Sequence, residues 1–156
     1  KFLLEPEDDR THLYVSTGTG IAPFVSMIRD TMGRGEPRKT VVLHGCSFED
    51  ELGYRDYLEG LVRDGSYPLT YLPAISRPND PRNTGWTGRT GRVEAVVAGV
   101  CKDLGLRPDH TVVYICGNPE MILNVERELM RRDFPEFHVK KELYWPKGKD
   151  AGLKTG

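Results

Sequence analysis

The chain has 156 residues, a length that suits one domain with a sizeable hydrophobic core. Its 22 Lys and Arg residues nearly balance its 23 Asp and Glu residues, which argues against nucleic acid or an anionic membrane surface as the partner. The sequence has no apolar run long enough for a transmembrane helix, no signal-peptide pattern, and three cysteines without a CxxC pair or zinc-type spacing, so we expect a cytoplasmic protein with reduced thiols and no metal.

The first predicted strand, His12–Ser16, leads into a glycine-containing turn and then into a helix. The segment Ser16–Phe24 holds Gly18 and Gly20, which permit a sharp turn and a close approach of the backbone to a ligand. Pro23 suits the first turn of a helix, where a missing N–H costs nothing. Backbone amides and a helix N-terminus at one point favour a phosphate or pyrophosphate, so this segment predicts a nucleotide site. The alternative is a structural turn that binds no ligand.

Strands and helices are predicted to alternate along the rest of the chain. Four further apolar runs are predicted strands: Thr40–Cys46, Leu69–Ile75, Val112–Cys116 and His138–Tyr144. Apolar residues at helical spacing predict three more helices: Asp50–Arg63, Gly91–Leu104 and Pro119–Arg132. Because the first four strands are apolar rather than alternating, we expect helices on both faces of a parallel sheet. The predicted fold is a doubly wound, five-stranded α/β domain of the Rossmann-like kind.

In such a sheet, ligands bind beyond the carboxyl ends of the strands. The segments expected to converge there are Gly18–Gly20, Ser76-Arg77, Cys116-Gly117 and Glu142–Trp145. His44 also ends a strand, and we interpret it as a hydrogen-bonded structural histidine rather than a proton donor. Core positions are predicted for three further residues: Met27, Cys101 and Met121.

A set of ordered motifs runs from about Phe2 to Trp145. They are Gly18–Phe24, His44-Gly45, Glu51–Tyr54, Ser76-Arg77, Thr87–Val93, Cys116–Met121 and the terminal aromatic pair. Together they resemble the pyridine-nucleotide domain of the ferredoxin–NADP reductase family. The resemblance implies that residues 1–10 lead in from a separate FAD-binding β-barrel and that residues 11–145 bind NADP(H). Residues 146–156 depart from the family, many members of which end at or near the aromatic pair, and we interpret this Lys- and Gly-rich segment as a flexible tail.

The function implied by the resemblance is that of an electron-transfer flavoenzyme. NADPH would exchange a hydride with FAD held by the missing barrel domain, and FAD would exchange single electrons with ferredoxin or flavodoxin. This chain alone would bind nucleotide without turnover. Three alternatives stay open: the reductase component of an oxygenase system, a nucleotide-sensing or regulatory subunit without hydride chemistry, and a phosphate-binding α/β protein of the flavodoxin kind.

The resemblance assigns cofactor binding to three segments. The glycine-containing turn after the first predicted strand, which we call the phosphate loop, contributes Thr17, Gly18, Thr19, Gly20, Ile21 and Pro23. The segment after the fourth predicted strand contributes Gly117, Asn118 and Met121. Ser76 and Arg77 suit the 2′-phosphate of NADP, because a guanidinium is a planar fork of donors that stays charged.

Arg89 or Arg92 would supply a second charge for that phosphate. One alternative is that residues 77–83 are a solvated polar loop. Another is that Glu49 binds the ribose of NAD, although we interpret Glu49 as preceding or capping the second helix. NADP is therefore favoured over NAD.

The residues assigned to the reacting centre are Cys116, Glu142 and Tyr144. The resemblance puts Cys116 beside the nicotinamide, with a packing role that brings hydride donor and acceptor to near-contact distance. It puts Glu142 near the same point and an aromatic residue against the flavin ring. By strand alternation Tyr144 is the candidate for that aromatic, with Trp145 as the alternative. The competing interpretations are a core thiol for Cys116 and an aromatic packing edge for the pair.

Overall fold

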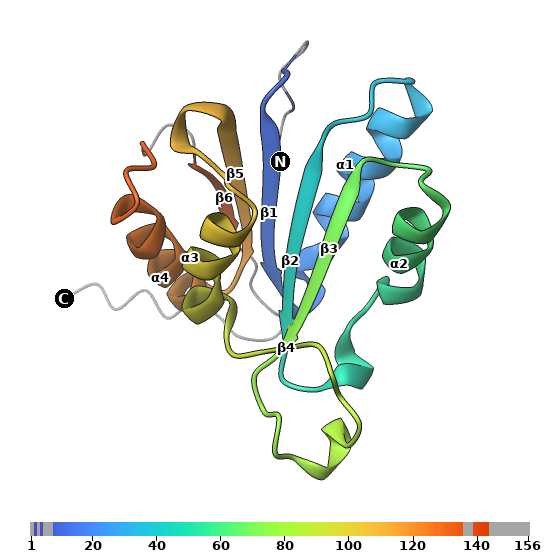
Figure 1. The fold of residues 1–156 in the computed structure, drawn as a ribbon, viewed down its shortest axis with the longest axis vertical. Helices are drawn as coiled ribbons and strands as arrows, with labels where there is room; N and C mark the ends of the chain where they lie inside the picture. Colours follow the sequence, from blue (N-terminus) through green and yellow to red (C-terminus); the bar gives the residue numbers. More distant parts are fainter. Residues whose placement is uncertain (1, 3, 5–7, 136–138, 144–156) are drawn as a thin grey trace, which may run out of the picture.

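Parallel strands form a single sheet in the computed structural model, which describes residues 2, 4, 8–135 and 139–143 (Figure 1). The strands are β1 (Thr11–Thr17), β2 (Thr40–Cys46), β3 (Leu69–Ile75), β4 (Arg89–Thr90), β5 (Thr111–Gly117) and β6 (Val139–Leu143). Their order across the sheet is β4-β3-β2-β1-β5-β6, so the direction of winding reverses between β1 and β5. All five predicted strands are present, and the doubly wound α/β fold is confirmed.

Four α-helices connect the strands within the described residues. They are α1 (Ala22–Gly33), α2 (Arg55–Asp64), α3 (Val93–Asp103) and α4 (Pro119–Met130). Short 3-10 turns precede several elements: η1 (Gly18–Ile21), η2 (Glu49–Glu51), η3 (Pro81–Asn83) and η4 (Pro108–His110). The second helix begins later than predicted, because residues 49–51 form η2 and Tyr54 adopts a left-handed backbone with φ 61° just before α2. No helix in the described part of the chain is long and apolar enough to cross a membrane.

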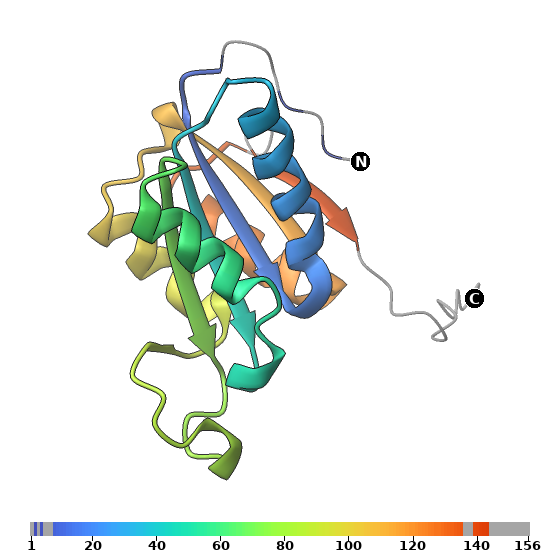
Figure 2. The same cartoon turned by 90° about the vertical axis from the view of Figure 1, so that its right-hand side faces the viewer.

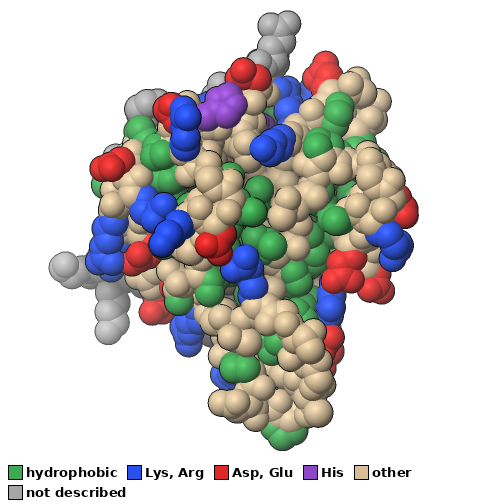
Figure 3. All heavy atoms as spheres, viewed as in Figure 1, with side chains coloured by type: hydrophobic (Ala, Val, Ile, Leu, Met, Phe, Trp, Pro, Cys, Tyr) green, Lys and Arg blue, Asp and Glu red, His purple; other side chains and the backbone are tan. Residues whose placement is uncertain are grey.

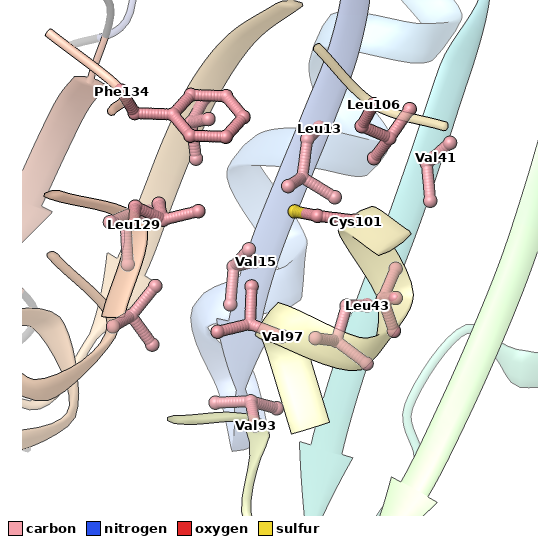
Figure 4. Packing of buried hydrophobic residues seen from close by; sticks show 14 of the residues in the cluster. Leu13, Val15, Val41, Leu43, Val93, Val97, Cys101, Leu106, Leu129 and Phe134 are labelled. Atoms are coloured by element: carbon pink, nitrogen blue, oxygen red, sulfur yellow. The ribbon is translucent and has the colours of Figure 1, made fainter. Parts of the chain in front are cut away.

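The helices cover both faces of the sheet, with α1 and α2 on one face and α3 and α4 on the other (Figures 1 and 2). Alternation along β1 divides the core between the faces, since Leu13 and Val15 pack under α3 and α4 while Tyr14 packs under α1 and α2. Figure 4 shows the first of these clusters, in which Val97 and Cys101 of α3 lie over β1. The predicted core positions Met27, Cys101 and Met121 are all buried.

Phe2 and Leu4 pack on the α1 face of the sheet. The ring of Phe2 stacks on Phe24, with 5.5 Å between ring centroids. Nearer the sheet, the Asp8 carboxylate accepts hydrogen bonds from the backbone N and the Nε of Arg10, at 3.0 and 2.9 Å. The fully buried His12 lies beside the same carboxylate, with Nε2 3.3 Å from Asp8 Oδ2. The interpretation of residues 1–10 as a lead-in from another domain stays a prediction, and the proposed tail lies outside the described residues.

One edge of the sheet is only partly covered. The two-residue strand β4 pairs with Ala74 and Ile75 at the end of β3. Residues 69–73 of β3, including Pro73, have no further strand beside them among the described residues.

Candidate nucleotide-binding site

A cleft of about 850 Å³ lies across the carboxyl ends of β1, β2, β3 and β5. Three segments that the sequence predicts to converge do line it: Thr17, Gly18 and Thr19 after β1, Ser76 and Arg77 after β3, and Gly117 and Asn118 after β5. Because the winding of the sheet reverses between β1 and β5, the cleft opens where ligands bind in doubly wound folds.

The loop after β1 lines this cleft with Thr17, Gly18 and Thr19. It forms the single turn η1, and Thr17 before it makes no side-chain capping bond. The first amides of a helical turn have no partner within the turn, so they are available to an anion. Gly18 has φ +54°, a conformation that favours glycine.

Three further residues predicted to bind the cofactor do not line the cleft: Gly20, Ile21 and Pro23. Gly20 and Ile21 are buried, and Pro23 lies in the first turn of α1. A Cβ on Gly20 would lie 2.5 Å from the Cys116 carbonyl oxygen, which means that the loop rests directly on the end of β5.

The end of β5 supplies a second helix N-terminus. The Asn118 side chain accepts a hydrogen bond of 2.8 Å from the backbone N of Met121 and so caps α4. Met121 is both buried and a lining residue of the cleft, which fits its two predicted roles. Cys116 is 1 % exposed and does not line the cleft.

Glu142 of β6 is aligned with Cys116 across the sheet. The side chain of Glu142 and the whole of Tyr144 and Trp145 lie outside the described residues. The predicted roles of these three residues therefore stay predictions.

The loop between β3 and β4 projects beyond the sheet (Figures 1 and 2). The buried side chain of Asn83 holds this loop in place. Its Nδ2 donates to the carbonyl oxygens of Ser47 and Arg77, at 3.0 and 2.8 Å. Its Oδ1 accepts from the backbone N of Glu49, at 2.8 Å. Asn83 thus ties the segment after β3, which carries Arg77, to the segment after β2.

We expect the substitution Asn83→Asp to loosen this loop, because a carboxylate would face two carbonyl oxygens that need a donor. Two lost hydrogen bonds and their unpaired buried partners correspond to about 2 kcal/mol in the free energy of unfolding. Urea denaturation measures that loss, and limited trypsin digestion detects faster cleavage after Arg82 or Arg89. The matched control is Asn79→Asp in the same loop, where the side chain is exposed and the same change should leave both measurements unaltered.

The arginines around the cleft differ in whether a carboxylate neutralises them. Arg82 lies 2.6 Å from Asp50 Oδ1, and Arg55 lies 2.8 Å from Glu49 Oε1. Arg77 and Arg92 line the cleft and have no ion pair with any described residue. Arg77 instead lies over the ring of Phe48, 5.4 Å from its centroid. These two guanidinium groups are therefore available to an anionic ligand.

Two further predictions about charged residues can be compared with the structure. Arg89 forms β4 and does not line the cleft. Glu49 precedes α2, as predicted, and is not a lining residue. Three carboxylates do line the cleft and were not predicted: Glu51, Glu94 and Glu120. Figure 3 shows basic and acidic side chains interspersed on one face of the molecule, in keeping with the near-balanced composition.

All three cysteines lie within the described residues, and none forms a disulfide. Burial raises the pKa of the Cys46 thiol to about 11 and that of Cys101 to about 11. Both are therefore protonated and poorly nucleophilic at neutral pH. Cys46 lines the cleft beside the phosphate loop, but its chemistry is that of a packed thiol.

The sequence model of the oxidoreductase NAD-binding domain family matches residues 14–127. The chain belongs to this family. The match covers every segment that lines the cleft, from the loop after β1 to the start of α4.

Relatives within this family support the resemblance to ferredoxin–NADP reductases. Ferredoxin–NADP reductase B of Sorangium cellulosum is 36% identical over 147 residues, which cover 92% of this chain and 58% of the relative. The phenol hydroxylase P5 protein of Acinetobacter pittii is 31% identical over 145 residues, covering 92% of this chain and 39% of the relative. A crystal structure of a ferredoxin NADP+ reductase from Neisseria gonorrhoeae with bound FAD and NADP superimposes with a TM-score of 0.71 at 25% identity, covering 89% of this chain and 58% of that one. The chain thus spans less than two thirds of the length of these relatives.

Proposed function

We propose that this chain is the NADP(H)-binding half of a flavin-dependent ferredoxin (flavodoxin)–NADP reductase. The observation that carries the proposal is the cleft, which is lined both by the start of η1 and by Arg77 and Arg92, two arginines with no ion pair to any described residue. The ferredoxin–NADP reductases among its relatives support the same assignment. In such a reductase, bound NADP(H) exchanges a hydride with FAD, and the remainder of the protein would hold the FAD. The FAD would in turn exchange electrons with ferredoxin or flavodoxin.

A cytoplasmic location fits the absence of disulfides among the three cysteines.

The chain's own residues would bind and orient the nucleotide. The amides of η1 would hold the pyrophosphate, and Arg77 with Ser76 would hold the 2′-phosphate. Arg92, at the start of α3, would add a second positive charge near that phosphate. Cys116 and Glu142, aligned on neighbouring strands, are proposed to border the nicotinamide, with Tyr144 or Trp145 against the flavin.

Calorimetric titration with 2′-phospho-AMP and with 5′-AMP at low salt tests the proposal. Hydrogen bonds to charged groups contribute roughly 1.5–3 kcal/mol, so we expect at least tenfold tighter binding of the ligand that carries a 2′-phosphate. The substitution Arg77→Ala should remove that preference. Arg107→Ala is the control, because Arg107 pairs with Asp109 at 2.6 Å near the opposite end of the sheet. No binding of either ligand by the folded chain would refute the nucleotide assignment.

The second candidate is an NAD(P)H-dependent reductase component of an oxygenase system. It is favoured by the likeness to the phenol hydroxylase P5 protein and to the reductase component of a propane 2-monooxygenase of Rhodococcus jostii, 29% identical over 111 residues. Equal affinity for the two adenosine phosphates would support this candidate, because it would remove the case for a 2′-phosphate site.

A further inference from the structure

His44 is a buried, hydrogen-bonded histidine, as predicted, and its two ring nitrogens join two different parts of the fold. Nε2 lies 3.0 Å from the carbonyl oxygen of Gly18, at the start of the phosphate loop. Nδ1 lies 3.1 Å from the hydroxyl of Tyr71 on β3. A chain of hydrogen bonds thus crosses the sheet from β3, through β2, to the loop after β1.

The partners of the ring determine its tautomer. Burial lowers the pKa of His44 below its usual 6.5, and the hydrogen bond to Gly18 offsets that effect only in part, so the imidazole is neutral at physiological pH. A carbonyl oxygen can only accept, so Nε2 carries the proton. Nδ1 therefore accepts from the Tyr71 hydroxyl, which stays protonated because burial raises its pKa.

The bond to Gly18 acts at the position where the loop turns. Gly18 has φ +54°, and the next three residues complete η1. The hydrogen bond from His44 restrains the Gly18 carbonyl and therefore the peptide group that enters η1. Neighbouring Cys46 lies beside the same nitrogen, with Sγ 3.8 Å from His44 Nε2, and its thiol donates to the carbonyl oxygen of Glu51 at 3.3 Å.

We propose that His44 and Tyr71 are positioning residues for the phosphate loop. The imidazole anchors the Gly18 carbonyl, Tyr71 fixes the tautomer that makes this possible, and the anchored loop binds the pyrophosphate of a nucleotide. This inference rests on the proposed nucleotide-binding function and adds the side chains that preorganise the loop. Preorganisation raises affinity because the loop loses less freedom on binding.

The experiment compares two ligands on the 156-residue chain by calorimetry: NADP+, which carries a pyrophosphate, and 2′-AMP, which does not. For His44→Leu we expect NADP+ to bind about tenfold more weakly, the change that one lost buried hydrogen bond of about 1.4 kcal/mol produces. Tyr71→Phe should weaken NADP+ about threefold, since the ring could then take the wrong tautomer. His44→Gln should recover most of the affinity, because its amide can still donate to Gly18. Binding of 2′-AMP should stay within twofold in every variant.

Two controls change similar groups away from the loop. His110→Gln alters an exposed histidine, and Tyr57→Phe removes a hydroxyl that has no hydrogen bond to any described residue. A uniform loss of affinity for both ligands, or unchanged affinity for NADP+ in His44→Leu, would overturn the inference.

A measurement without ligand separates this inference from the proposed function. In amide hydrogen exchange followed by NMR, the backbone N–H of Ala22, which donates to the Thr19 carbonyl in η1, should exchange about tenfold faster in His44→Leu than in the unaltered chain. Nitrogen-15 spectra of the imidazole should show Nε2 protonated and Nδ1 unprotonated. If the unaltered chain binds neither ligand, the proposed function fails. Unchanged exchange at Ala22, or the opposite tautomer, would refute the positioning role whether or not a ligand binds.

Discussion

Replacing Gly20 with alanine is expected to reduce nucleotide affinity by at least about a hundredfold. The new Cβ would lie 2.5 Å from the carbonyl oxygen of Cys116 and 3.0 Å from its carbonyl carbon. Both are backbone atoms of β5, so the phosphate loop has to move away from the strand. Losing two hydrogen bonds from the loop to a charged phosphate corresponds to about 3 kcal/mol, or a factor above one hundred. Overpacking of this kind also lowers the free energy of unfolding by about 1–3 kcal/mol.

Calorimetry with NADP+ and urea denaturation measure the two effects of Gly20→Ala. The matched control is Gly99→Ala in α3, where the added Cβ meets no atom within 4 Å. Alanine is favoured over glycine inside a helix, so this control should raise the free energy of unfolding by roughly 0.5–1 kcal/mol and leave affinity unchanged. Binding of NADP+ by Gly20→Ala with unaltered affinity would contradict the close contact between the loop and β5.

Stability is expected to fall by about 3 kcal/mol as the pH decreases from about 6.5 to about 4, because of His12. Burial lowers the pKa of His12 from 6.5 to about 4, even though the nearby Asp8 carboxylate opposes the shift. Between these two values the unfolded chain binds a proton that the folded chain does not, so acid favours unfolding. The contribution is complete above pH 6.5. Below pH 4, protonation of Asp8 lowers the free energy of unfolding further. Burial alone would raise the pKa of Asp8, but hydrogen bonds from Arg10 outweigh that effect and lower the pKa to about 2.

Urea denaturation at a series of pH values from 7.5 to 4 tests the role of His12. In His12→Gln the free energy of unfolding should decrease by about 3 kcal/mol less over this pH range than in the unaltered chain. The smaller contribution of His44 should remain, because burial also lowers the pKa of His44. His110→Gln is the control, because it makes the same replacement at an exposed histidine. An unaltered slope in His12→Gln would rule out His12 as the titrating group.

The strands and the phosphate loop could be predicted because their signals are local. Apolar runs such as Val112–Cys116 are long enough to identify a buried strand, and a glycine-rich turn between a strand and a helix limits what the backbone can do. The strand β4 escaped prediction because it has two residues and exists only through its pairing with the end of β3. The start of α2 was misjudged because Tyr54 takes a left-handed conformation that is uncommon for an aromatic residue.

The contacts that hold the site together could not be predicted in the same way. The side chain of Asn83 contacts Glu49 and Ser47, which lie 34 and 36 residues earlier in the sequence. Its role therefore depends on how the loop between β3 and β4 folds back. The pairing of His44 with Tyr71 depends on the register of β2 and β3 and on both side chains facing the same helices. The carboxylates in the cleft were missed because acidic residues at a helix start are also typical of ordinary capping.

The exposed edge at β3 has a consequence for association between molecules. The backbone N of Ser76 donates toward β2, to Cys46, whereas the carbonyl of Ile75 accepts from Gly91 on the other side. Because the polar groups of one residue point to one side and alternate along a strand, Pro73 faces outward with Ile75. Proline has no N–H, so a strand from another chain would find a gap in the row of donors. Where β4 does not cover it, this edge is thereby protected against the strand addition that leads to aggregation.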